Sequence, residues 1–442
     1  MAVKKAVCAT LASTCALLLS SAVTTASAAV TVLGWPGGPE EAALREVIKQ
    51  YNAQSDVSEN DKVEALFFNR EGFWDKLQSD LAAGTTEFDV NLTATYAIGR
   101  YAPYMDTVKL DSNEAFDDSV LATMQFEGKQ YGVPTDLSLH FMYYRSDLID
   151  KLLNDEGWKK LYAEISEKHL GKAMTPVHPD EWTWEDYTAT SLFFAKSVNK
   201  KSPVRYGTAL QMKNLLFNMM VWHSGAKAFG GDWRDTSGNI TVNSDGFRTA
   251  LKRYKTLYDA GASPKDSLSY EYAEANAAFG SGQVATMMQW NAAAGDLTDP
   301  EKNPNIAGKV GITAPPKGPA GRFTHIHGLG FGINASAKNK EGAAKFLNWL
   351  STADAAKGYA LAGGNPALKK SISTQIADDR PDLVTLGDYA GAFGFVMNGG
   401  TAAKALSIYE LQAKEFTGYW AGQQTLDEAL QNTEKGMAEL LK

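Results

Sequence analysis

Residues 30–51 read VTVLGWPGGPEEAALREVIKQY, and this stretch decides the fold class. The run at 30–33 is short, apolar and rich in valine, which is typical of a buried strand. A Gly- and Pro-rich turn follows at 34–38, and Pro39 suits the first turn of a helix. Apolar side chains then recur at helical spacing, at Leu44, Val47, Ile48 and Tyr51. The stretch therefore predicts a strand, a turn and a helix, the opening unit of an α/β fold.

The alternation of strands and helices continues along the chain. Strands are predicted at 63–68 and 88–92, with a helix at 73–83 that ends at Gly84. Such alternation predicts βαβ units and a mostly parallel sheet. A second α/β region begins near 132–144. Its predicted elements are helices at 186–196, 214–222, 245–260 and 340–350, strands at 284–289 and 325–333, and amphipathic helices beyond Gly364.

The N-terminus has the pattern of an export signal. Lys4 and Lys5 precede an apolar stretch, and Ala26-Ser27-Ala28 supplies the small residues that a signal peptidase accepts. The apolar stretch is shorter than the roughly 20 residues that span a bilayer, although a membrane anchor is the competing interpretation. We expect residues 1–28 to be a signal peptide, cleaved after Ala28.

Removal of this leader changes the chemistry of the chain. Both cysteines, Cys8 and Cys15, lie within it, and no convincing lipobox precedes Cys15, so the mature protein would have no disulfide and no lipid anchor. The leader carries two lysines and no acidic residue, which leaves 41 basic and 51 acidic residues, a net charge of −10. This charge argues against nucleic acid or anionic lipid as a partner. We expect a monomer of at least two domains, free in the periplasm.

Several ordered motifs together resemble a known family. They are FDV at 88–90, GKQYGVP at 128–134, YYRSDL at 143–148, WTWED at 182–186, YG at 206–207, AFGSG at 278–282, TMMQW at 286–290, GFGIN at 330–334 and AAKFLNWL at 343–350. In this order and spacing the mature chain resembles the extracellular solute-binding proteins (family 1) of carbohydrate ABC importers, the group that includes maltose-binding protein.

The resemblance implies a two-lobed α/β fold, a type II-like periplasmic binding protein with hinge strands between the lobes. Matching the motifs places crossovers near 135–140, 287–290 and 331–334. The first lobe would be residues 29–136 plus 291–332, and the second 137–290 plus 333–442. The resemblance also implies that the protein is no enzyme, has no cofactor, binds a small carbohydrate in the cleft and docks on the transmembrane permease subunits of an ABC transporter.

Candidate contacts follow from what a sugar requires. Aromatic rings cover its C–H faces and polar groups bond its hydroxyls, at an interface between domains. In α/β sheets such groups follow the carboxyl ends of strands. The candidates at these positions are Trp35, Asn69, Arg70, Thr93, Thr95, Tyr96, Asp136, Ser138, Trp290, Asn291, His327, Gly364 and Asn365, with Trp222 and Gly231 as weaker ones.

Several candidates also have a structural interpretation. Trp35 could seal the start of the helix, and Asp136 could cap a turn. Trp290 and Trp222 could pack in the core, and Asn69 with Arg70 could form a solvated loop. His325 and His327 share a strand face, but zinc would need further ligands that the sequence does not group with them.

Three functions stay open beside one another. A carbohydrate binder is favoured, and a binder of a polyol or of a sugar or glycerol phosphate is the alternative within the same family. A secreted glycoside hydrolase or polysaccharide lyase would need paired carboxylates, which Glu181, Glu185 and Asp186 could suggest. The pattern of Thr183 followed by Asp186 instead favours a helix capping box.

Overall fold

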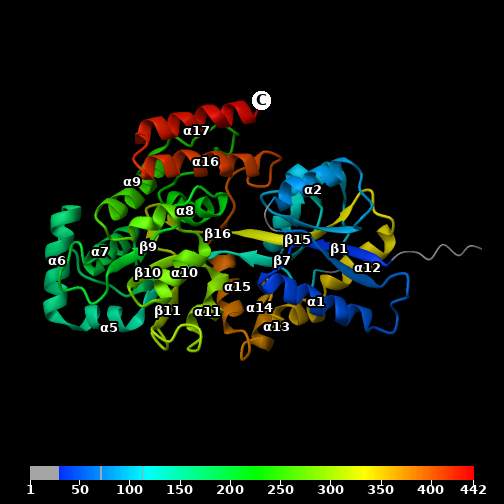
Figure 1. The fold of residues 1–442 in the computed structure, drawn as a ribbon, viewed down its shortest axis with the longest axis horizontal. Coiled ribbons are helices and arrows are strands. Elements are labelled where there is room, and N and C mark those ends of the chain that lie inside the picture. Colours follow the sequence, from blue (N-terminus) through cyan, green and yellow to red (C-terminus); the bar gives the residue numbers. More distant parts are fainter. Residues whose placement is uncertain (1–28, 70–71, 112) are drawn as a thin grey trace, which may run out of the picture.

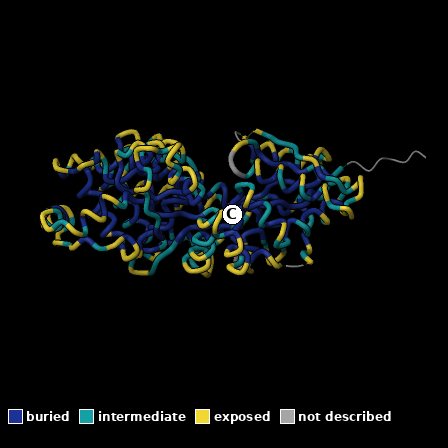
Figure 2. The backbone as a smooth tube through the Cα atoms, turned by 90° about the horizontal axis from the view of Figure 1, so that it is seen from below, coloured by how far each residue is buried: buried dark blue, intermediate teal, exposed yellow. Residues whose placement is uncertain are grey.

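The computed structural model of this chain describes residues 29–69, 72–111 and 113–442, which fold into two lobes side by side (Figure 1). The predicted leader with both cysteines, and the candidate Arg70, lie outside the described residues. Figure 2 shows buried segments in the interior of both lobes and exposed segments around them.

The first lobe is built on a sheet with the strand order β2-β1-β3-β15-β4, to which β7 is added by pairing with β15. The predicted opening unit is confirmed as β1 and α1, and β1 pairs in parallel with both β2 and β3. The strands are β1 (Val30–Gly34), β2 (Val63–Phe67), β3 (Val90–Ala94), β4 (Met105–Asp106), β7 (Val133–Ser138) and β15 (His327–Asn334). The helices are α1 (Gly38–Asn52), α2 (Phe73–Ala82), α3 (Ile98–Tyr101), α4 (Asp118–Leu121), α12 (Lys340–Leu350) and α13 (Ala353–Leu361).

The second lobe has a four-stranded sheet in the order β11-β8-β10-β9. Its strands are β8 (His140–Arg145), β9 (Tyr206–Ala209), β10 (Val284–Trp290) and β11 (Val310–Thr313). Its helices are α5 (Ser146–Asn154), α6 (Glu156–Leu170), α7 (Trp184–Phe194), α8 (Leu216–Ala228), α9 (Asp245–Asp259), α10 (Tyr272–Gly280) and α11 (Ala294–Thr298). The C-terminal helices α16 (Ala405–Trp420) and α17 (Leu426–Leu440) cover this lobe, with α16 packed on α8 and α9 (Figure 1).

Three connections join the lobes. Leu139 separates β7 of the first sheet from β8 of the second, as the crossover predicted at 135–140 requires. Ile326 separates β14 (Thr324–His325) from β15. The third connection runs through α14 (Lys370–Ser373), α15 (Pro381–Phe393) and β16 (Gly394–Phe395), where β16 pairs in parallel with β14. Short hairpins complete the fold: β5 (Gln125–Phe126) with β6 (Lys129–Gln130), and β12 (Lys317–Gly318) with β13 (Gly321–Arg322).

The pairing differs from the sequence prediction in three respects. The sheets are mixed, because β15 is antiparallel to β3, β4 and β7, and β10 is antiparallel to β8. The chain does not change lobes at 287–290, since β11 returns to pair with β8, which places much of 291–332 with the second lobe. Nor does it change lobes at 331–334, because β15 stays in the first sheet to its end and α12 and α13 pack on α1.

Among the described residues, no helix combines the length and the apolar character that crossing a membrane requires.

Candidate ligand-binding cleft

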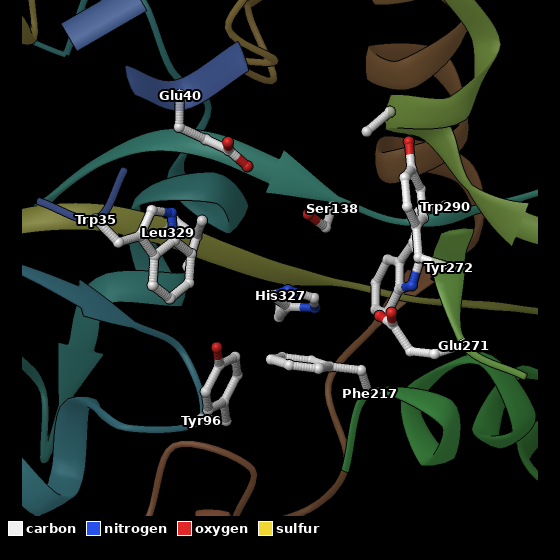
Figure 3. Close-up of a pocket in the computed structure, with 11 residues that line it drawn as sticks. Trp35, Glu40, Tyr96, Ser138, Phe217, Glu271, Tyr272, Trp290, His327 and Leu329 are labelled. Carbon is white, nitrogen blue, oxygen red and sulfur yellow. The ribbon is translucent and has the colours of Figure 1, made fainter. Parts of the chain in front are cut away.

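A cavity of about 270 Å³ lies where the two lobes meet (Figure 3). The first lobe lines it with side chains that follow β1 and β3 or lie on β7 and β15, and the second lobe faces them with side chains near α8, α10 and β10. The lining residues are Trp35, Glu40, Tyr96, Ser138, His327 and Leu329 on one side, and Phe217, Glu271, Tyr272, Trp290 and Ala292 on the other. Five predicted residues are therefore brought together here: Trp35, Tyr96, Ser138, Trp290 and His327.

Trp35 reaches the cleft because it directly follows β1. Its ring packs edge-on against Phe73 and Trp74 at the start of α2, with ring centroids 5.4 and 5.5 Å away. This packing leaves it 9% exposed, so the ring is held rigidly in the core with one part on the cavity. The cavity-lining and structural interpretations of Trp35 are thus compatible.

A chain of ring contacts crosses the cleft from lobe to lobe. The imidazole of His327 lies 5.4 Å from the ring of Tyr96 and 4.9 Å from that of Trp290. Phe217 of the second lobe contacts Tyr96 of the first at 6.2 Å, in an edge-on arrangement. Ser138 pairs with His327 across the β7–β15 ladder, which places a hydroxyl beside the imidazole at the junction of the lobes.

The described lining of the cleft contains two carboxylates and one imidazole. Burial lowers the pKa of His327 to about 3, so its imidazole is neutral at pH 7. Its Nδ1 is buried and has no hydrogen-bond partner among the described residues. Glu40 in the first turn of α1 and Glu271 at the start of α10 supply two carboxylates. The Glu271 carboxylate also caps α10 by accepting the backbone N–H of Glu274. No lysine or arginine is among the described lining residues.

Asp136, Gly364 and Asn365 meet one another outside this lining. The Asp136 carboxylate accepts the backbone N–H of Asn365 at 2.8 Å and the Tyr359 hydroxyl. Leu137 N–H donates to the Asn365 carbonyl at 2.8 Å, and Arg380 donates to the Gly364 carbonyl and to Asn365 Oδ1, each at 2.9 Å. We call this set, Asp136, Leu137, Tyr359, Gly364, Asn365 and Arg380, the Asp136 junction. Burial, with the nearby charge of Glu40, raises the pKa of Asp136 to about 7.

Three other candidates lie on or near the strands that lead to the crossings between the lobes. Thr95 Oγ1 accepts the backbone N–H of Gly328 at 2.7 Å, just after the second crossing. Asn291 Oδ1 accepts the N–H of Leu139 at 2.9 Å, on the first crossing. Thr93 is fully buried in β3, opposite Gly330 of β15. None of these three side chains is among the described residues that line the cavity.

The remaining candidates lie elsewhere. Asn69 lines a surface hollow beside Phe67, Phe68 and Lys76. Trp222 is 1% exposed and packs against Phe247 and Phe416 of the second lobe, and Gly231 lies against Phe247, as their core interpretation predicts.

Sequence reasoning missed six lining residues: Glu40, Phe217, Glu271, Tyr272, Ala292 and Leu329. Glu40 lies in the first turn of α1, just after the turn that contains Trp35. Its position close to the end of β1 could have indicated that it lines the cleft. Glu271 and Tyr272 lie at the start of α10, which gave no signal of facing the cleft, because the two sides of the cavity meet only through tertiary packing.

The geometry also bears on a metal site and on the carboxylates that a glycoside hydrolase would use. No group of three or more His, Cys, Asp or Glu side chains in the described part of the chain is arranged to hold a metal ion. The predicted capping box is confirmed: Thr183 Oγ1 accepts the N–H of Asp186 at 3.2 Å, and the Asp186 carboxylate accepts the N–H of Thr183 at 2.9 Å. Asp186 therefore acts as a helix cap.

Comparison with known proteins identifies the family. Residues 46–385 match the family described as bacterial extracellular solute-binding protein. The chain belongs to this family. It is thus a solute-binding protein of the kind that serves ABC transporters.

Relatives of known name share part of the sequence. A putative binding protein of Brucella abortus is 24% identical over 340 residues, 73% of this chain and 75% of that one. The lactose-binding protein of Rhizobium radiobacter is 26% identical over 337 residues, 74% of this chain and 71% of the relative. A probable amino-acid ABC transporter periplasmic-binding protein of Sinorhizobium fredii is 27% identical over 186 residues, which is 41% of each chain.

Solved structures show the same fold. A maltose-bound protein of T. maritima has a TM-score of 0.75 at 21% identity, over 93% of this chain and 99% of that one. A ribitol-bound solute-binding protein of Agrobacterium radiobacter has a TM-score of 0.72 at 19% identity, over 93% and 98%. These similarities confirm the predicted two-lobed α/β architecture.

Proposed function

We propose that this protein captures a sugar, or a closely related polyol, in the cleft between its lobes and delivers it to the permease subunits of an ABC importer. The observation that carries the proposal is the cleft lining: aromatic rings from both lobes surround a cavity that Ser138 and His327 also line. Apolar ring faces suit the C–H faces of a polyhydroxylated ligand, and the polar groups suit its hydroxyls.

The proposed mechanism is closure of the lobes by a hinge motion. A ligand that contacts rings of both lobes favours the closed form only to the extent that it binds that form more tightly. We place the moving bodies at 29–138 with 327–362, and at 139–325 with 394–442. The segment 363–393, which contains α14 and α15, would lie behind the hinge.

The proposal includes export of the protein to the periplasm. The leader pattern at 1–28 supports export followed by cleavage after Ala28, which would release a free monomer into the periplasm. Mass spectrometry of the protein purified from the periplasmic fraction tests this, since the mature chain would begin at Ala29. A retained leader would contradict it.

A thermal-shift screen tests the ligand class. Sugars, polyols, sugar phosphates and amino acids are compared, because a ligand that binds only the folded state raises the midpoint of unfolding. We expect a saturable shift from at least one sugar or polyol, with no product formed on prolonged incubation. A shift confined to phosphates or amino acids would overturn the proposed ligand class, and product formation would show an enzyme.

A further inference from the structure

A short segment of the second lobe crosses to the first lobe beside the cleft. Residues 397–404, between β16 and α16, form this segment, which we call the strap. Its base is fixed on the second lobe: the Asn398 N–H donates to the Asp232 carboxylate at 3.1 Å, and Asn398 Nδ2 donates to the Arg234 carbonyl at 2.9 Å. The Trp233 indole N–H donates to the Asn398 carbonyl. The strap therefore belongs to the moving body of the second lobe.

Hydrogen bonds within the strap maintain its shape. The Gly400 N–H donates to the Met397 carbonyl at 2.6 Å, and the Ala402 N–H donates to the Gly399 carbonyl at 3.0 Å. Gly399 has a φ of 82°, a conformation that glycine adopts without strain. The Met397 side chain is buried. The strap is therefore a compact turn with bonds of its own.

The tip of the strap lies directly against the first lobe. A methyl group added at Gly99 of α3 would lie 2.3 Å from the Thr401 carbonyl oxygen and 2.7 Å from the Ala403 nitrogen. Non-bonded heavy atoms pack best at about 3.5–4.0 Å, so only a residue without a side chain fits here. The backbone contact at Gly99 joins the two moving bodies.

This contact closes one end of the cleft. Gly99 closely follows the lining residue Tyr96 in the chain, and the Tyr96 ring meets that of Phe217 from the second lobe at 6.2 Å. Figure 3 shows a loop from the late part of the chain below Tyr96 and Phe217. Two rings in contact, with the strap beyond them, therefore form a wall at this end.

The helix that follows the strap reaches the first lobe as well. Burial, together with the nearby charge of Asp75 in the first lobe, raises the pKa of Glu410 on α16, and the charge of Arg100 opposes this shift. Arg100, on α3 beside Gly99, bonds to the Asp75 carboxylate at 3.2 Å. The strap and α16 thus approach the same face of the first lobe.

The size of the cavity agrees with a closed end. Its volume of about 270 Å³ lies just below the range of about 300–1,000 Å³ that is usual for ligand pockets. A longer saccharide would have to extend along the cleft, and at the strap it would meet backbone that has no room to give way. Such a clash excludes a ligand more effectively than the absence of a contact does.

We propose that the natural ligand is a single sugar ring, or an open-chain polyol of similar size, and that the strap excludes longer saccharides. The inference rests on the proposed function and narrows its substrate class. Gly99 is a positioning residue, because it allows the strap to approach and does not itself touch the ligand.

Probe series of increasing length test the inference by calorimetry. The series are glucose, maltose and maltotriose; galactose, melibiose and raffinose; and sorbitol, maltitol and maltotriitol. In each series that binds, we expect the first member to bind at least about tenfold more tightly than the second, and the third to show no detectable binding.

Two variants test whether the strap is the cause. Gly99→Ala forces the strap away from α3 and should reduce the preference for the first member over the second at least about fivefold. Asn398→Ala removes the bond to the Arg234 carbonyl, which loosens the base, and should act in the same direction. Gly391→Ala on α15 is the matched control, because its added methyl group meets no atom within 4 Å, and it should keep the full preference.

The outcomes separate the two proposals. A trisaccharide that binds as tightly as the single ring of its series would overturn the inference and leave the proposed function intact. A preference for short probes that is unchanged in the folded strap variants would also overturn it, and if Gly99→Ala does not fold, Asn398→Ala decides alone. If no sugar or polyol of any length binds, the proposed function fails and the inference fails with it.

Discussion

The cleft and the Asp136 junction lie close together where the lobes meet, yet their polar groups are in opposite situations. At the junction the Asp136 carboxylate, the Asn365 amide and the Arg380 guanidinium bond to groups of the protein itself. In the cleft, the side chains of His327, Ser138 and Trp290 line a cavity. Since the cleft presents side chains of both lobes to an open space, it is suited to an external ligand, whereas the junction is suited to holding segments together.

The first way to test this contrast is acidification, which should have the largest effect. Burial lowers the pKa of His223 and of His327 to about 3, whereas an unfolded histidine titrates near 6.5. Between these values the unfolded state binds protons that the folded state does not, so stability is lost as the pH falls below about 6.5. Going from neutral pH to about 4.5 should cost about 2.7 kcal/mol for each of the two histidines.

Denaturant unfolding at a series of pH values measures this loss. His327→Gln should reduce the slope in this range by about one proton, or about 1.4 kcal/mol per pH unit. His178→Gln, at an exposed histidine, is the control. A wild-type protein equally stable at both pH values would show that the buried histidines are not held neutral.

Trp290 should contribute both to ligand binding and to folding stability. Removing its ring with Trp290→Ala should weaken sugar binding about 100-fold, close to 3 kcal/mol, because aromatic residues at the centre of an interface carry much of the binding energy. The ring is 8% exposed and lies 4.1 Å from His140, so stability also falls, by about 3 kcal/mol. Calorimetry on the folded protein measures the affinity.

A second tryptophan provides the matched comparison. Trp349 on α12 packs against Tyr51 at 5.2 Å, away from the cleft, and Trp349→Ala should lower stability with affinity preserved. Trp290→Phe keeps a ring and should recover part of the binding. Equal affinity in Trp290→Ala and wild type would remove this residue from the site.

At the Asp136 junction the opposite pattern is expected. Asp136→Ala leaves the Tyr359 hydroxyl and the Asn365 N–H without their acceptor, so the free energy of unfolding should fall by about 2 kcal/mol with ligand affinity largely retained. Chemical unfolding and calorimetry on the same sample measure the two quantities. A large loss of affinity at unchanged stability would place Asp136 in the site.

The pH response of the junction also has the opposite sign to that of the cleft. The folded pKa of Asp136, about 7, lies above the unfolded value near 3.9, so the folded state holds an extra proton between them. The stability that Asp136 contributes to the folded protein therefore falls as the pH rises through that range, whereas the contribution of His327 falls as the pH drops. Asp136→Asn, which cannot titrate, should steepen the net decline towards acid.

Features that depend on local sequence could be predicted, whereas features that depend on tertiary pairing could not. The strand, turn and helix of 30–51 were predictable because local periodicity determines them, and so was the position of Trp290 at a strand end. The lobe to which residues 310–313 belong could not be predicted, because β11 pairs with β8, a strand far away in the sequence. Glu271 was also not predictable as a cleft residue, since an acid before a helix is equally explained as a cap, a role that it also has.

The smallest expected effect comes from a site far from both regions. Thr183→Ala removes the cap of α7, because Thr183 Oγ1 accepts the N–H of Asp186, and should lower the free energy of unfolding by about 1 kcal/mol. Affinity for any ligand should stay the same, and Thr183→Ser, which restores the hydroxyl, should recover most of the stability. Since Asp186 is one of the carboxylates that a glycosidase would use, an effect of Asp186→Asn on product formation from a glycoside would contradict its assignment as a cap. If Thr183→Ala and Asp186→Asn lower only the stability, the start of α7 has no part in ligand recognition, which then stays with the cleft.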